Sequence, residues 1–187
     1  MDGNAPRPLL FLDVDGPLIP FGAGPEQYPD GYPTYPALPA PPVSPMRRTG
    51  LGPQPAAVNP LLTRINPAHG PRLAALPCDL VWATTWMADA NECVAPWLGL
   101  PELPFVVWPD PSDSDEAEWG APHWKTRPLV HWASGRDFLW VDDEITDADR
   151  TWVAAHHRGR ALLHRVDHRH GLTDADFAAL EEWLTHF

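Results

Sequence analysis

Acidic side chains follow two apolar runs of the sequence, and their spacing could support metal chemistry. Asp13 and Asp15 come directly after the run LLFL, and Asp142 and Asp143 end the run FLWVDD. Carboxylates that gather in one crevice repel one another unless a cation lies among them. Oxygen ligands of this kind suit Mg²⁺. The sequence therefore predicts a Mg²⁺ site, provided that the fold brings the two groups of acids together.

Two further residues could complete a site for an anion. Thr84 ends the apolar run DLVWAT and offers a hydroxyl and a backbone N–H, and Lys125 lies near the start of a predicted helix. A hard cation, a lysine and a hydroxyl together form a site of phosphate size. A carboxylate oxygen beside that site could attack phosphorus and form an acyl phosphate.

Strands and helices alternate along the sequence, which indicates an α/β fold with a parallel sheet covered on both faces. In such sheets ligands bind beyond the carboxyl ends of the strands, where both groups of acids lie. The apolar runs predict five strands, at 9–14, 78–84, 103–108, 138–143 and 161–166. Helical spacing predicts helices at 60–76 (interrupted by prolines), 85–98, 123–133, 147–158 and 173–186.

A proline-rich segment at 20–60 interrupts this pattern. The chain has 25 prolines, and in this segment they recur every few residues with glycines between them. Regular helix or strand is therefore not expected there. Because the segment also contains Phe21, Tyr28, Tyr32 and Tyr35, we expect a loop that lies on the surface rather than a fully solvated tail.

Composition limits the class of protein. The 187 residues suit one domain with a real core, and 44% are hydrophobic. The net charge of -12 leaves room only for a local basic face, whereas proteins that grip long nucleic acids usually show a broad one. Two cysteines are too few for a disulfide framework or a zinc cluster. No secretory signal or membrane span is recognisable, so we expect a cytoplasmic protein with no membrane partner.

Four motifs in order resemble the haloacid dehalogenase (HAD) superfamily. They are an apolar strand followed by DxD (LLFLDVDG), a strand ending in threonine (DLVWAT), a lysine (HWKTR) and a strand ending in paired acids (FLWVDDE). The likeness covers about 8–166 apart from the proline-rich segment. WATTW with a following DAN, and the VDDE form, are most similar to the HAD-type domain of Swiss Army knife RNA-repair proteins.

The resemblance implies a HAD-like Rossmannoid three-layer sandwich, with a central parallel sheet of about five strands and the proline-rich insertion in place of a compact cap. A single domain at 1–187 would hold it. The resemblance also implies residue roles. Asp13 would be the nucleophile that takes the phosphoryl group, and Asp15 would protonate the leaving group and then activate water. Thr84 and Lys125 would hold the phosphate and stabilise charge in the transition state.

The same resemblance implies how Mg²⁺ would be bound. Its ligands would be the Asp13 carboxylate, the Asp15 backbone carbonyl and Asp142, with Asp143 acting through water or behind these ligands. Pro17 is a departure, since the family usually has threonine or valine there. Pro17 removes an N–H and stiffens the turn, but it leaves the nucleophile and the acid in place.

Other residues near the motifs leave alternatives open. Trp86 and Trp124 each lie within two residues of a predicted catalytic residue, so they could stack on a nucleobase or simply pack in the core. Arg47 could bind a second phosphate or be an ordinary surface residue. The histidines at 164–170 fit no strong metal-ligand spacing.

The predicted function is a Mg²⁺-dependent phosphohydrolase that acts through an aspartyl phosphate. Its phosphorylated substrate could be a nucleic-acid (RNA) end, a nucleotide or a small metabolite. A non-catalytic module that binds phosphate remains an alternative, as does a dehalogenase that needs no Mg²⁺. The sequence does not determine the oligomeric state.

Overall fold

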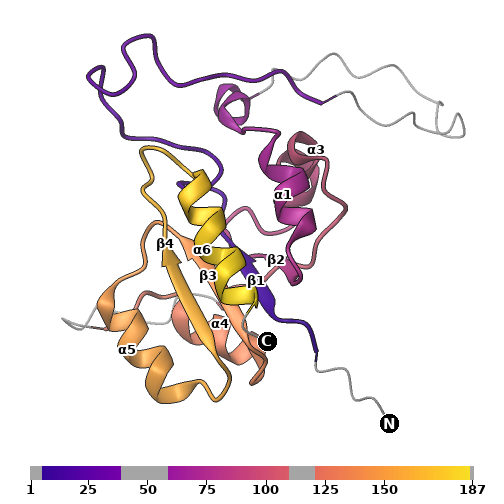
Figure 1. Ribbon diagram of the computed structural model, residues 1–187, viewed down its shortest axis with the longest axis vertical. Helices are drawn as coiled ribbons and strands as arrows, with labels where there is room; N and C mark the ends of the chain where they lie inside the picture. Colours follow the sequence, from indigo (N-terminus) through magenta and orange to yellow (C-terminus); the bar gives the residue numbers. More distant parts are fainter. Residues whose placement is uncertain (1–5, 39–58, 110–120, 186–187) are drawn as a thin grey trace, which may run out of the picture.

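Four parallel strands form the centre of the fold in a computed structural model of the chain, which describes residues 6–38, 59–109 and 121–185 (Figure 1). The strands are β1 (Leu9–Leu12), β2 (Asp79–Trp82), β3 (Phe138–Asp142) and β4 (Ala161–Arg165), in the order β2-β1-β3-β4. β1 therefore lies between β2 and β3, and the chain crosses over between neighbouring strands. The α/β class that the sequence predicted is confirmed.

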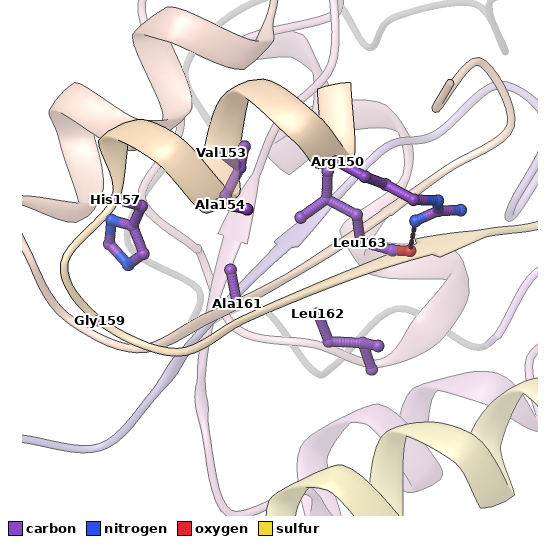
Figure 2. A pocket seen from close by; sticks show the side chains of 8 residues that line it. All are labelled: Arg150, Val153, Ala154, His157, Gly159, Ala161, Leu162 and Leu163. Carbon is purple, nitrogen blue, oxygen red and sulfur yellow. Dashed lines mark hydrogen bonds between the residues drawn. The ribbon is translucent and has the colours of Figure 1, made fainter. Parts of the chain in front are cut away.

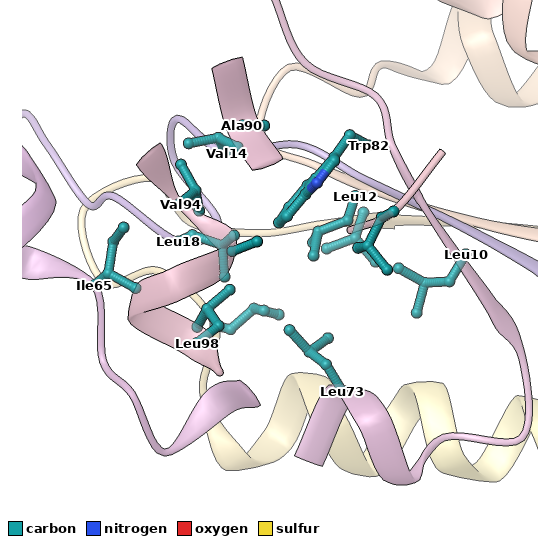
Figure 3. Close-up of a cluster of buried hydrophobic side chains, with 14 of the residues drawn as sticks. Leu10, Leu12, Val14, Leu18, Ile65, Leu73, Trp82, Ala90, Val94 and Leu98 are labelled. Carbon is teal, nitrogen blue, oxygen red and sulfur yellow. The ribbon is translucent and has the colours of Figure 1, made fainter. Parts of the chain in front are cut away.

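Alternate side chains of the strands enter two cores, one on each face of the sheet. Leu10 and Leu12 pack with residues of α1, α2, α3 and α6, and Figure 3 shows this cluster around Trp82 and Leu98. Leu9 and Phe11 pack on the other face, against α4 and α5. Because both faces of β1 are buried, its run of apolar residues shows no alternation. The three-layer arrangement is confirmed.

The prediction of a fifth strand at 103–108 is wrong among the described residues, because this segment forms only one bridge to the sheet. Phe105 pairs with Trp82: the Trp82 N–H donates to the Pro104 carbonyl (2.9 Å), and the Val106 N–H donates to the Trp82 carbonyl (2.9 Å). The next N–H of a parallel ladder would have to come from residue 104, and proline has none. Pairing with the Leu80 carbonyl therefore cannot continue, and the sheet has four strands.

The helices agree with the predicted positions but are shorter and more broken. Residues 60–76 form a 3₁₀ helix and α1, separated at Pro67, and residues 85–98 form a turn followed by two short helices. Pro71 fits inside α1 because it lies in the first turn. The helices are η1 (Pro60–Arg64), α1 (His69–Ala75), α2 (Asp89–Cys93), α3 (Ala95–Leu98), α4 (Thr126–Ala133), α5 (Asp147–His156) and α6 (Asp174–Thr185).

The described part of the proline-rich segment, up to residue 38, contains no regular helix or strand, as expected. It is nevertheless attached to the rest of the fold. The Phe21 ring stacks on His168 with centroids 4.9 Å apart, and the Phe21 N–H donates to the His168 carbonyl (2.8 Å). The Arg64 guanidinium lies 4.4 Å from the centre of the Tyr32 ring. Phe21 thus holds this segment beside the loop that follows β4, and Tyr32 holds it beside the end of the 3₁₀ helix at 60–64.

Candidate active site

The carboxyl ends of β1, β2 and β3 lie side by side, and each leads into a residue expected in the site. The Asp13 N–H donates to the Val141 carbonyl (3.0 Å), which continues the pairing of β1 with β3. The Ala83 N–H donates to the Leu12 carbonyl (2.9 Å), so Thr84 leaves β2 beside the same edge. The parallel register therefore brings together residues that are far apart in the sequence.

Lys125 joins the two groups of acids. Its ammonium donates to Asp13 Oδ2 (2.7 Å) and to Asp142 Oδ2 (2.8 Å). The side chains are almost completely excluded from solvent, with exposed fractions of 3% for Lys125, 7% for Asp13 and 0% for Asp142. A buried lysine between two buried carboxylates is costly to assemble and needs each partner to compensate its charge. Three of the residues expected in the site thus form one contact network.

Asp143 completes an acidic cluster with Asp13 and Asp142. One carboxylate oxygen from each residue lies within 4.8 Å of the others, and all three side chains are buried. Asp143 packs against Gly16, where an added Cβ would come within 2.6 Å of the Asp143 carboxyl group. Gly16 also has a φ of +86°, which favours glycine. The turn after β1 is therefore shaped to admit the Asp143 carboxylate.

Burial inside this cluster raises the pKa values of two of its acids. Burial, helped by the neighbouring Asp142, raises the pKa of Asp13 from 3.8 to about 7, although Lys125 acts in the opposite direction. Burial and then Asp142 also raise the pKa of Asp143. Burial alone would lower the pKa of Lys125, but Asp13 and Asp142 outweigh burial and raise it. The cluster therefore holds three carboxylates, of which two contact the Lys125 ammonium.

A divalent cation fits this cluster. Such an ion would favour the ionised carboxylates, and the donor set is all oxygen, which suits Mg²⁺. Among the residues that the structure describes, no other group of acids converges in the way that Asp13, Asp142 and Asp143 do. The three buried carboxylates could therefore hold a metal ion.

Asp15 lies in the tight turn after β1 and is linked to Trp86. The turn is closed by the Gly16 N–H, which donates to the Ile19 carbonyl (3.1 Å). The Trp86 indole N–H donates to Asp15 Oδ2 (2.9 Å). Sequence reasoning placed both residues near the site but did not predict this contact, because the two residues are 71 positions apart.

Thr84 is buried at the start of the turn that follows β2. Its carbonyl accepts hydrogen bonds from the Trp108 indole N–H (2.9 Å) and from the Met87 N–H (3.2 Å). Its hydroxyl accepts a long hydrogen bond from the Trp86 N–H (3.4 Å). Met87 has a backbone φ of 45°, which residues other than glycine rarely adopt. This turn holds both Thr84 and Trp86 in place.

Asp149 positions the segment that carries Lys125, and sequence reasoning missed this residue. Asp149 is fully buried at the start of α5. Its carboxylate accepts hydrogen bonds from the His123 N–H (2.6 Å), the Thr126 hydroxyl (2.5 Å) and the Thr146 N–H (2.7 Å). The sequence signal was the capping box formed by Thr146 and Asp149. Its second role, toward the start of α4, has no local signal.

The remaining candidates are placed differently. Trp124 is 47% exposed; the Lys125 ammonium lies 5.7 Å from its ring centre, and the ring packs edge-on against Trp108. Trp86 packs partly against the core, so core packing and contact with the site are both present. Arg47 lies outside the described residues.

The hollow between α5 and β4, about 340 Å³ in volume, is separate from this site (Figure 2). Its polar side chains include Arg150 and His157, and none of the acids of the site lines it. The Arg150 guanidinium donates to the Leu163 carbonyl and so caps the open edge of β4. The site is recognised by the charged side chains that meet at the carboxyl ends of the strands. This hollow, which none of those side chains lines, is not part of it.

Comparison with protein families assigns the chain. The family described as the HAD domain in Swiss Army Knife RNA repair proteins matches residues 9–177. The chain belongs to this family. The match includes every described residue of the site, from Asp13 to Asp149. No curated protein and no solved structure matches the chain.

Membership of the HAD superfamily agrees with the three-layer fold and with acids at the ends of β1 and β3. It indicates a hydrolase of the phosphatase kind that acts on a phosphorylated substrate and generally uses a metal ion. No helix in the described part of this HAD domain is long and apolar enough to cross a membrane.

Proposed function

We propose that this HAD domain is a Mg²⁺-dependent phosphomonoesterase that acts through an aspartyl phosphate on Asp13. The observation that carries the proposal is the buried cluster in which Lys125 contacts Asp13 and Asp142 while Asp143 lies beside them. A cluster that existed only to stabilise the fold would gain little from three buried carboxylates around one lysine. A phosphoryl group, with a cation beside it, gives all four side chains a role.

In the first step, one Asp13 carboxylate oxygen attacks phosphorus, and the bond between phosphorus and the leaving-group oxygen breaks. The proton of the Asp15 carboxyl group passes to that leaving oxygen. In the second step, water attacks the phosphorus of the aspartyl phosphate, and its proton passes to the Asp15 carboxylate. The bond between Asp13 and phosphorus then breaks, so both residues return to their starting states.

Lys125 and Thr84 have supporting roles in this proposal. The Lys125 ammonium fixes the Asp13 carboxylate at 2.7 Å and places positive charge where the phosphoryl oxygens would lie. Thr84 is held at the carboxyl end of β2, where its hydroxyl and N–H could donate to the phosphate. Mg²⁺, held by Asp13, the Asp15 carbonyl and the acids after β3, would neutralise charge on the phosphate.

The substrate that we propose is a phosphate at the end of an RNA chain. Two observations support it: the family is described from RNA repair proteins, and the half-exposed Trp124 ring lies beside Lys125, where a base next to the phosphate could stack. A chain end needs few phosphate contacts, so the net charge of -12 is compatible with it. Small phosphorylated metabolites are the alternative substrates.

The test is phosphate release by the wild type and by Asp13→Asn, each with Mg²⁺ and with EDTA. We expect turnover by the wild type with Mg²⁺ alone, and a loss of at least about 1000-fold in Asp13→Asn, because the amide cannot form the acyl phosphate. The substrates are an aryl phosphate, RNA oligonucleotides with 5′ or 3′ phosphate, and small sugar phosphates.

Each other outcome would indicate a different function, nucleophile or substrate. Turnover that persists in EDTA would contradict the metal requirement and favour a dehalogenase type of site. Binding of phosphorylated RNA without turnover of any substrate would indicate a non-catalytic module. A fully active Asp13→Asn would remove Asp13 as the nucleophile. Faster turnover of sugar phosphates than of RNA ends would replace the proposed substrate.

A further inference from the structure

The side chain of Trp86 links the core of the protein to the carboxylate of Asp15. Its indole N–H donates to Asp15 Oδ2 at 2.9 Å, while its ring packs partly against the core cluster on the α1 face of the sheet. Its backbone is fixed in the turn after β2, where the Trp86 N–H donates to the Thr84 hydroxyl (3.4 Å). Trp86 therefore has little freedom to move away from Asp15.

Asp15 has few other restraints on its side chain. The backbone of its turn is closed by hydrogen bonds, but within residues 6–38, 59–109 and 121–185 no hydrogen bond except that from Trp86 reaches the Asp15 carboxylate. Asp15 is also only half-buried. A carboxylate in this position can adopt several rotamers, and proton transfer needs it within hydrogen-bond reach of one oxygen atom.

We propose that Trp86 is a positioning residue, which orients the Asp15 carboxylate for proton transfer to the leaving group. This inference rests on the proposed phosphatase function. It assigns Trp86 a role in the reaction step rather than in stacking on a base. Trp124, which is exposed beside Lys125, is then left as an aromatic ring available to the substrate.

The chemistry of the indole group suits this role. An indole N–H is a donor only and does not titrate near neutral pH. It can donate to Asp15 both when the carboxyl group carries the proton and when it has lost it, so the orientation can persist through both steps. A lysine or an arginine would add a charge that opposes protonation of Asp15, and a histidine would compete for the same proton.

The role predicts a dependence on the leaving group. Release of p-nitrophenolate needs little protonation, whereas release of an alkoxide needs a proton from Asp15. In Trp86→Phe the ring remains but the N–H is lost. We expect kcat/KM for an alkyl phosphate, which reports only the steps up to phosphoryl transfer to Asp13, to fall about 10- to 100-fold, part of the total that general acid catalysis contributes. We expect kcat/KM for p-nitrophenyl phosphate to change less than about threefold, because departure of this leaving group makes little use of the acid.

The matched control is Trp152→Phe, which removes an indole N–H away from Asp15, since the Trp152 ring stacks on His156 at the end of α5. It should leave the ratio of the two rates unchanged. Equal losses on both substrates in Trp86→Phe would indicate a purely structural role and overturn the proposal. No change, or a faster reaction with the alkyl phosphate, would also overturn it, since a faster reaction would mean that Trp86 holds Asp15 away from the leaving group.

A second measurement does not depend on turnover. The NMR signal of the Trp86 indole N–H can be assigned by its loss in Trp86→Phe. In Asp15→Ala this signal should shift upfield because its acceptor is gone, while the Trp124 signal should stay in place. An unchanged Trp86 signal would overturn the proposal. Wild type that turns over neither substrate would instead contradict the proposed phosphatase function, which the rates of the variants alone do not test.

Discussion

Asp142 and Asp143 are neighbours in the sequence, but their surroundings differ. Asp142 Oδ2 accepts hydrogen bonds from Lys125 (2.8 Å) and from the Trp140 indole N–H (3.1 Å), and its Oδ1 accepts from the Glu144 N–H (2.9 Å). The Asp143 carboxylate packs against Gly16 and lies 3.9 Å from the His168 ring nitrogen. Both carboxylate oxygens of Asp142 thus accept hydrogen bonds, whereas those of Asp143 have more lone pairs left for a cation.

We therefore predict that Asp143 binds Mg²⁺ directly and that Asp142 mainly holds Lys125, which reverses the order that the resemblance implied. Asp143→Asn should weaken Mg²⁺ binding at least about 10-fold, the loss expected when an essential metal contact is removed. Asp142→Asn should weaken it less, because its main partner is Lys125. Isothermal titration calorimetry with Mg²⁺ measures both affinities.

Glu181→Gln is the control for removal of one negative charge, since Glu181 is exposed on α6. Its Mg²⁺ affinity should equal that of the wild type. If Asp142→Asn loses more affinity than Asp143→Asn, Asp142 is the direct ligand and the difference in hydrogen bonding does not decide metal ligation.

At the scale of the elements, one buried carboxylate joins α5 to the segment that carries Lys125. Asp149 caps its own helix through Thr146 and also accepts from His123 and Thr126 at the start of α4. Burial alone would raise the pKa of Asp149, but the hydrogen bonds from Thr126, Thr146 and His123 outweigh it and lower the pKa. The ionised carboxylate is therefore the form that the fold stabilises.

We predict that Asp149→Asn lowers the free energy of unfolding by about 2 kcal/mol at pH 7, the upper end for loss of a helix cap. It should also slow phosphate release, because the Lys125 segment loses its anchor. Because the folded pKa of Asp149 lies below the unfolded value, its stabilisation is present above the unfolded value near 3.8 and is lost as pH falls through the folded pKa. The difference between variant and wild type should therefore shrink at low pH in urea titrations.

Asp176→Asn is the matched control, since Asp176 forms the equivalent capping box with Thr173 at the start of α6. It should lose stability, with the same direction of pH dependence, because hydrogen bonds also lower the pKa of Asp176 despite its burial. Phosphate release at saturating substrate should stay near that of the wild type. A similar loss of activity in both variants would mean that Asp149 acts through general stability and not through Lys125.

At the scale of the whole molecule, the sequence predicts the features that follow from single segments or from the parallel pairing of strands. Strands β1 and β3 are continuous apolar runs in the sequence. A parallel sheet necessarily brings their carboxyl ends to one edge. Asp13, Asp142 and Asp143 could therefore be grouped from the sequence, and the structure brings them together with Lys125. Lys125 was also predicted to lie near the start of a helix, and it directly precedes α4.

What the sequence did not predict depends on single backbone groups or on contacts across the fold. The segment around Phe105 has strand composition, but the missing N–H of Pro104 stops its pairing with β2. The contact of Trp86 with Asp15 and that of Asp149 with Thr126 join residues from different crossovers, which no local pattern encodes. These contacts appear only once helices and strands are packed.

The acidic cluster should make the stability of the whole molecule depend on Mg²⁺ and pH. Without a cation, the folded pKa of Asp13, about 7, lies above the ordinary value of 3.8. Protonation of Asp13 therefore favours the folded state at low pH, and this contribution is lost as pH rises from about 4 through about 7. A cation among the carboxylates removes the repulsion and binds best when they are ionised.

We predict that Mg²⁺ raises Tm, and that the increase is larger at pH 8 than at pH 6. At 100 times Kd a ligand adds about 2.7 kcal/mol, which for a chain of this size corresponds to about 5–10 °C. Differential scanning calorimetry measures the shift, with NaCl at equal ionic strength to separate binding from screening of the net charge of -12. Asp143→Asn should lose most of the shift. An equal rise in NaCl, or a larger rise at pH 6, would show that Mg²⁺ acts on the surface charge and not on the cluster of Asp13, Asp142 and Asp143.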